Sequence, residues 1–123
     1  MKTTGRRLIK CPILAQKIQT PEGFQKLVAH VPQKDCEVLY VGAEPPTDNL
    51  FMYVLAPDKY DAKGEPRMYE VEELRPIEFI VALPGHLIPK GYKWRAISKA
   101  KVGLVFLFEL QEESMIMLPG GRA

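Results

Sequence analysis

The chain has 123 residues, of which 46% are hydrophobic and 26% are charged, and its formal net charge is +2. This composition is typical of a globular protein and excludes a chain that is disordered throughout. No apolar stretch approaches the roughly 18 residues that cross a bilayer, so we expect no membrane partner and a cytoplasmic location. The length predicts one domain over residues 1–123, with residues 112–123 as an extended tail.

The near-neutral total hides four blocks of charge along the chain. Residues 1–34 carry a net charge of +6, residues 35–78 of −7, residues 79–101 of +5 and residues 102–123 of −2. Opposite blocks can neutralise each other across paired strands, or they can form separate surface patches that attract partners. The sequence leaves both arrangements open.

The first predicted strand covers residues 6–14. Pro12 lacks a backbone N–H donor, so the strand suits an edge of the sheet, or a position in which the proline lies at the strand end. Residues 21–31 fit either a short helix or a strand. We favour a strand over residues 25–31, paired with the next segment through a turn at residues 32–35.

Two strongly apolar segments, residues 36–42 and 50–56, predict a β-hairpin. The loop between them contains Pro45, Pro46 and Asp48, which favour a rigid, protruding turn. A protruding loop is a candidate contact for a partner.

Residues 67–74 also fit either a helix or a strand, and Pro76 is expected to end that element. Residues 77–83 and 104–110 are compact apolar strands, and the second is expected to be buried on both faces. Together these segments predict a mainly β protein, with an α+β fold as the alternative. The predicted architecture is a small antiparallel sheet sandwich or half-open barrel with at most one or two short helices.

A basic strand is predicted over residues 90–101, KGYKWRAISKAK. Strict alternation puts the bases on a solvated face and Tyr92 and Trp94 on the core face. A nucleic-acid site would need bases and aromatic rings on one surface, so this alternation disfavours it. The candidate binding residues are these bases and three loop residues: Lys90, Lys93, Arg95, Lys99, Lys101, Pro45, Pro46 and Asp48.

No pattern in the sequence predicts catalysis. Cys11, Cys36, His30 and His86 lack the close pairing of metal ligands, and we expect reduced thiols and a structural role for His86 in its turn. No nucleophile elbow, P-loop or HExxH motif is present. We therefore predict a protein that is not an enzyme and needs no metal or cofactor.

Five segments resemble a family of small, uncharacterised β-rich proteins of tailed bacteriophages and prophages. They are Ile9–Leu14, Glu37–Val41, Leu50–Pro57, Gly85–Pro89 and Leu104–Glu109. The likeness covers about residues 6–110, and the sequence departs from the family pattern at Leu83-Pro84, Leu87 and Phe106. The family has no activity to transfer. The resemblance implies a small phage protein that acts inside a bacterial host cell by binding.

The sequence thus predicts an accessory protein that binds a host protein, such as an anti-defence or host-takeover inhibitor. A nucleic-acid-binding module that uses residues 90–101 is the first alternative. A virion structural or assembly protein is the second, in which Met115–Leu118 mediate self-association.

Overall fold

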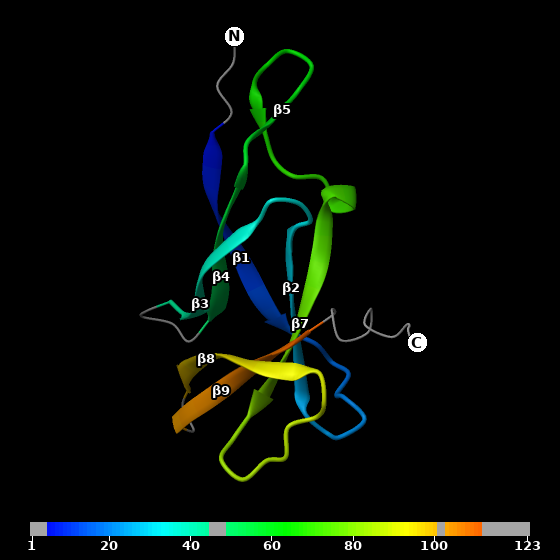
Figure 1. The fold of residues 1–123 in the computed structure, drawn as a ribbon, viewed down its shortest axis with the longest axis vertical. Helices are drawn as coiled ribbons and strands as arrows, with labels where there is room; N and C mark the ends of the chain where they lie inside the picture. The colour runs from blue at the N-terminus through cyan, green and yellow to red at the C-terminus, as the bar shows by residue number, and fades with distance from the viewer. Residues whose placement is uncertain (1–4, 45–48, 101–102, 112–123) are drawn as a thin grey trace. The chain divides into compact units, whose positions relative to one another are not determined.

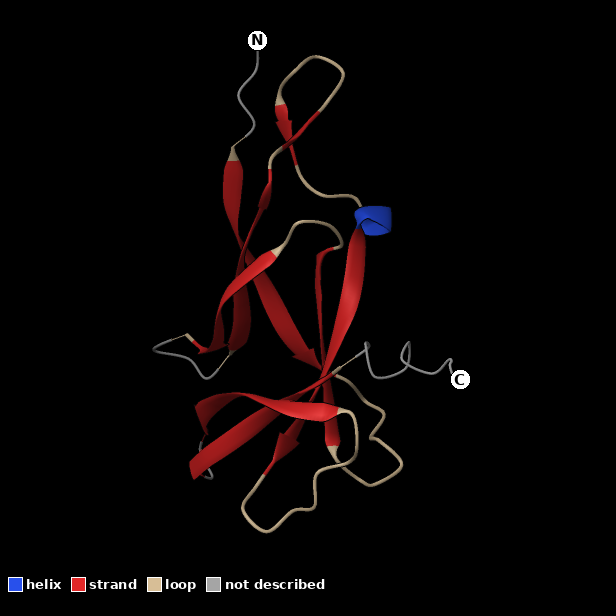
Figure 2. Ribbon diagram, viewed as in Figure 1, coloured by secondary structure: helices blue, strands red, loops and turns tan. Residues whose placement is uncertain are grey.

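The computed structural model describes residues 5–44, 49–100 and 103–111, and the described chain is mainly β (Figures 1 and 2). The long strands are β1 (Arg6–Ala15), β2 (Gln25–Pro32), β3 (Glu37–Ala43), β4 (Leu50–Pro57), β7 (Leu74–Ala82), β8 (Tyr92–Ala100) and β9 (Gly103–Leu110). They form a seven-stranded sheet in the order β3-β4-β1-β2-β7-β9-β8. The predicted mainly β class and its antiparallel sheet are confirmed.

The chain forms two compact units. Unit 1 comprises residues 1–14 and 29–76, and unit 2 comprises residues 15–28 and 77–123. β2 and β7 contribute residues to both units. In unit 1 the most buried large side chains include Met52, Val54 and Val31, and in unit 2 they include Phe79, Ile80 and Leu107.

The predicted β3–β4 hairpin is confirmed, and β4 also pairs with β1. β1 therefore lies between β4 and β2, which corrects the expected edge position. Pro12, opposite Phe51, lies near the C-terminal end of β1. A proline there removes one donor while the rest of the ladder stays intact.

The ambiguous residues 21–31 contain β2, so the strand interpretation is confirmed. The turn before it is closed by Thr20, whose Oγ1 accepts a hydrogen bond of 3.0 Å from the Phe24 N–H. The expected pairing of β2 with the next strand is wrong, because β3 lies at the sheet edge with β4 as its neighbour and β2 lies between β1 and β7.

Residues 67–74 are neither a helix nor one strand. They contain the end of β6 (Pro66–Arg67), which pairs with β5 (Lys59–Tyr60), and the 3₁₀ turn η1 (Val71–Glu73), blue in Figure 2. β7 begins at Leu74 and continues through Pro76. Pro76 therefore does not end the element, since extended backbone accommodates the φ of proline.

The Pro84-Gly85 sequence forms the turn that follows β7. The His86 N–H donates to the Leu83 carbonyl at 3.1 Å, and Gly85 has a φ of 98°. This is the pattern of a type II turn, which places proline second and requires positive φ at the third residue. His86 Nδ1 also accepts a 3.0 Å hydrogen bond from the Leu83 N–H, so its predicted structural role in the turn is confirmed.

β9 is covered less completely than its apolar sequence indicates. Val105 and Leu107 are buried, whereas Phe106 and Phe108 are half-buried and Leu104 is exposed. Successive residues of a strand point to opposite faces. One face of β9 therefore enters the core and the other is only partly covered, which corrects the expected burial on both faces.

We predict that Phe79→Ala lowers the free energy of unfolding by about 3 to 5 kcal/mol, because this side chain is fully buried in unit 2. Leu87→Ala, in the same unit, is the matched control. Leu87 is 90% exposed, so its truncation should change the free energy by less than about 0.5 kcal/mol. Urea denaturation of both variants checks the prediction, and equal effects would contradict it.

Candidate functional site

A β-bulge in β8 sets the geometry of the candidate site. β8 pairs with β9 along its length, but the register shifts between Trp94 and Ala96. Trp94 lies opposite Phe108 and Ile97 lies opposite Phe106. Phe106 and Phe108 are two residues apart in β9 and share a face, so Trp94 and Ile97 share that face as well.

This surface, the β8–β9 face, contains large apolar side chains that the described residues leave uncovered. Trp94 is 58% exposed, Ile97 is 48% exposed and Leu104 is 57% exposed. Exposed single apolar residues are ordinary, whereas a contiguous group marks a contact surface. Figure 1 shows β8 and β9 running side by side in this hairpin.

A small apolar cluster supports the other end of the same sheet face. Phe24, Ile80 and Ala82 are buried, and they are packed against by the half-buried side chains of Ile88, Tyr92 and Phe108. Ile80 lies opposite Phe108 in the register of β7 and β9. The β8–β9 face is therefore the uncovered continuation of a packed surface.

Tyr92 is also fixed by a polar contact. Its hydroxyl donates a hydrogen bond to Glu78 Oε2, and Lys26 Nζ lies 3.3 Å from Glu78 Oε1. Burial, together with the hydrogen bond to this carboxylate, raises the pKa of Tyr92 above its ordinary value. Tyr92 thus anchors the start of β8, and the bulge follows two residues later.

The structure distributes the predicted basic residues differently from strict alternation. Lys99 lies opposite Leu104 and shares the β8–β9 face with Trp94, while Lys93 lies opposite Glu109. Arg95 Nε lies 3.2 Å from Glu109 Oε1, close enough for an ion pair but without a hydrogen bond. The expected separation of bases from aromatic rings is therefore wrong for Lys99 and Trp94.

The ion pairs show where the charge blocks are neutralised. Three pairs join the first block to the second in unit 1: Arg6 with Glu37, Arg7 with Asp58 and Lys10 with Glu44. Lys90, Lys93 and Lys99 form no ion pair with any residue that the structure describes. The third block thus keeps positive charge at the surface, and Lys99 places one of these charges on the β8–β9 face.

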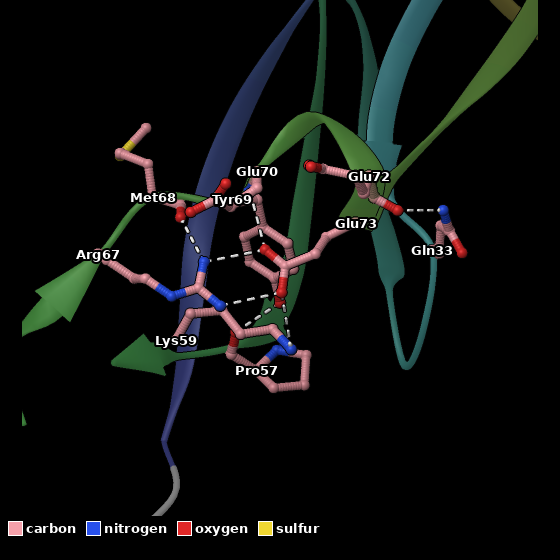
Figure 3. A network of polar contacts seen from close by, with 9 residues as sticks. All are labelled: Gln33, Pro57, Lys59, Arg67, Met68, Tyr69, Glu70, Glu72 and Glu73. Atoms are coloured by element: carbon pink, nitrogen blue, oxygen red, sulfur yellow. Dashed lines mark hydrogen bonds and ion pairs between the residues drawn. The ribbon is translucent and has the colours of Figure 1, made fainter. Parts of the chain in front are cut away.

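Unit 1 contains a polar network centred on the Glu73 carboxylate (Figure 3). Arg67 donates to both of its oxygens, at 2.9 and 3.0 Å, and the Glu70 N–H donates to it at 2.8 Å. Lys59 Nζ lies 3.6 Å away. Arg67, with help from the Glu70 amide, lowers the pKa of Glu73 from 4.5 to about 2.

The cysteine thiols are not activated for nucleophilic chemistry. Burial raises the pKa of Cys11 to about 11, and burial also raises that of Cys36, so both thiols are poor nucleophiles at neutral pH. Both cysteines are free. The described residues contain no group of three or more His, Cys, Asp or Glu side chains that could hold a metal. In residues 5–44, 49–100 and 103–111, no helix is long and apolar enough to cross a membrane.

The structure describes only part of the predicted contact surface. Lys101, Pro45, Pro46, Asp48 and Met115–Leu118 lie outside the described residues. Among the rest, Lys90, Lys93 and Lys99 are exposed and Arg95 is half-buried. The predicted binding residues do not include Trp94, Ile97 and Leu104, which the structure shows to be exposed.

Comparisons with protein-family models, with curated proteins and with solved structures found no match.

We predict that the chain's single tryptophan, Trp94, has the fluorescence of an indole in water in the folded protein. Iodide should quench it more strongly than caesium, because Lys99 on the same face attracts anions. Stern–Volmer titrations at low salt check this, and added sodium chloride should reduce the difference. A blue-shifted emission that resists both quenchers would contradict the exposed position.

We also predict that Glu73 stabilises unit 1 in a pH-dependent way. Its pKa is lowered on folding, so its contribution is fully present above the ordinary value of 4.5 and is lost as the pH falls towards 2. Urea midpoints should show Glu73→Gln less stable than the native protein at neutral pH, with a gap that closes between those two values. The control is Glu72→Gln, whose exposed side chain lies outside the network. A gap that does not change with pH would contradict the prediction.

Proposed function

We propose that this protein is a non-enzymatic binding module that engages another protein through the β8–β9 face. The observation that carries the proposal is the group of three exposed apolar side chains, Trp94, Ile97 and Leu104, on one face of a hairpin. Tryptophan is prominent among residues that dominate binding free energy at protein interfaces. The half-buried side chains of Phe106 and Phe108 share this face and lie opposite Ile97 and Trp94, which extends the apolar surface.

The surrounding charge defines the partner. Lys99 is exposed on this face, Lys90 and Lys93 are exposed in the same hairpin region, and none of the three pairs with a described residue, so an acidic surface complements this region. The partner surface is therefore apolar at its centre and acidic at its rim. The resemblance to tailed-phage proteins supplies the setting: an accessory protein that binds a host protein in the bacterial cytoplasm, as an anti-defence or host-takeover inhibitor does.

Binding is assigned to the face of the hairpin and not to the edge of the sheet. β8 is an edge strand, and edge strands can accept an added strand. Lysines and bulges, however, are the features that protect an edge from such pairing, and β8 has both. The exposed apolar side chains project from the face. A partner on the face therefore removes more apolar surface from water than a strand added at the edge.

Single-stranded nucleic acid is the second candidate, favoured by the shared face of Trp94 and Lys99. Ile97 and Leu104 are aliphatic and offer no ring on which a base can stack. These two residues are the reason that a protein partner ranks first.

The test is affinity capture from bacterial host lysate with three forms of the chain: native, Trp94→Asp and Leu87→Asp. We expect a protein retained by the native chain and by Leu87→Asp, which alters an exposed residue of the same unit, but lost from Trp94→Asp. With the purified partner, Trp94→Asp should weaken binding by about tenfold or more. Circular dichroism checks that Trp94→Asp is folded, and Ile97→Asp serves as a second disrupting variant.

Two results would overturn the proposal. One is a capture that Trp94→Asp does not change. The other is salt-sensitive binding of an oligothymidylate that needs Trp94, with no protein retained, which assigns the face to nucleic acid. Sedimentation of the native chain covers the remaining alternative: a dimer that Trp94→Asp converts to monomer assigns the face to self-association.

A further inference from the structure

A cavity of about 370 Å³ lies in unit 1, separate from the residues of the β8–β9 face. Its lining comes from three stretches of chain: residues 7–12 of β1, His30 and Pro32 of β2, and residues of the segment 59–74. A volume of this size is within the range of roughly 300 to 1,000 Å³ that small-molecule sites occupy. The proposed function does not use it.

The lining combines apolar and cationic groups. Leu8, Pro12, Met68, Tyr69 and Leu74 contribute apolar surface. The cationic lining residues are Arg7, Lys10, Lys59 and Arg67, with His30 as a fifth basic side chain. None of the described lining residues is acidic. A ligand that satisfies both features has an apolar body and a negatively charged group.

Each of the four cationic side chains already contacts a carboxylate outside the lining. Arg7 lies against Asp58, Lys10 lies against Glu44, and Lys59 and Arg67 both lie against Glu73. Four basic side chains of the lining thus contact three carboxylates. A lysine has three donors and an arginine has five, so a base that already pairs with one carboxylate can donate to a second anion.

One wall of the cavity is held in place before any ligand binds. The Tyr69 hydroxyl donates to the Pro57 carbonyl at 2.5 Å, and Arg67 Nη1 donates to the Met68 carbonyl at 2.8 Å while it also binds Glu73 (Figure 3). These contacts fix the backbone on both sides of the Met68 side chain. A preformed wall reduces the ordering cost of binding.

Two apolar side chains of the lining, Met68 and Leu8, are largely exposed to solvent, and we take them as the mouth of the cavity. Met68 is 82% exposed and Leu8 is 59% exposed, although both are large and apolar. A ligand in the cavity would cover them and remove this apolar surface from water. Methionine is well suited to such a position, since its unbranched side chain adapts to an irregular ligand.

From these observations we infer that unit 1 binds a small amphipathic carboxylate, of the medium-chain fatty-acid class, with its apolar body against Leu8 and Met68 and its carboxylate among the cationic side chains.

The test is calorimetric titration of the full chain with decanoate, kept below its micellar concentration, and with decanol as the neutral ligand of equal length. We expect one decanoate per chain, and binding at least about tenfold tighter than that of decanol, since a charge-assisted contact is lost with the alcohol. Met68→Glu should weaken decanoate binding by about tenfold or more, because it puts a like charge at the mouth. Leu39→Glu, at an exposed position of the same unit outside the lining, should leave it within about twofold.

Three results would each overturn the inference: equal binding of decanol and decanoate, decanoate binding that Met68→Glu does not change, or a signal that appears only with micelles or with phosphatidylglycerol vesicles. The last result would assign the cationic and apolar groups to a lipid surface. Because Trp94 does not line this cavity, the outcome is independent of the proposed function.

Discussion

The outward position of Trp94 depends on one extra residue in β8. A strand turns successive side chains to opposite faces, so a single insertion reverses every assignment on one side of it. Before the bulge Trp94 faces the same way as Phe108, and after it Ile97 faces the same way as Phe106. If every residue of β8 were paired in strict alternation, with no bulge, Trp94 would instead share a face with Ala96, which is buried.

Ion pairing differs between the two units. In unit 1 most bases have a carboxylate within 4 Å, and the network around Glu73 uses that attraction to hold an irregular segment in one conformation. In unit 2 the lysines of the third block have no such partners among the described residues, whereas Lys26 and Arg95 do. Ion pairs therefore hold side chains in place in unit 1, whereas the described lysines of the third block in unit 2 have no carboxylate partner among the described residues.

Sequence patterns predicted those features that depend on local chemistry. The apolar runs located β3, β4, β7 and β9. Partner choice between strands depends on the whole sheet, which is why the neighbours of β1 and β2 were not predicted. The bulge left no residue signature in KGYKWRAISKAK, so the exposure of Trp94 was not predicted either. The cavity of unit 1 is lined by three stretches that lie far apart in the sequence, so no single sequence motif could predict it.

Apolar contact and charge make different contributions at the β8–β9 face. In a complex of the kind proposed, burial of Trp94, Ile97 and Leu104 would remove apolar area from water and set the lifetime of the complex, since most differences in affinity arise in the dissociation rate. Exposed lysines act over a distance of about 10 Å at 0.1 M salt and mainly raise the rate of encounter with an acidic partner. A partner held by this face should therefore dissociate at a rate that depends on Trp94 and associate at a rate that depends on ionic strength. The bulge places both determinants on one surface, because it brings Trp94 to the face that already carries Lys99.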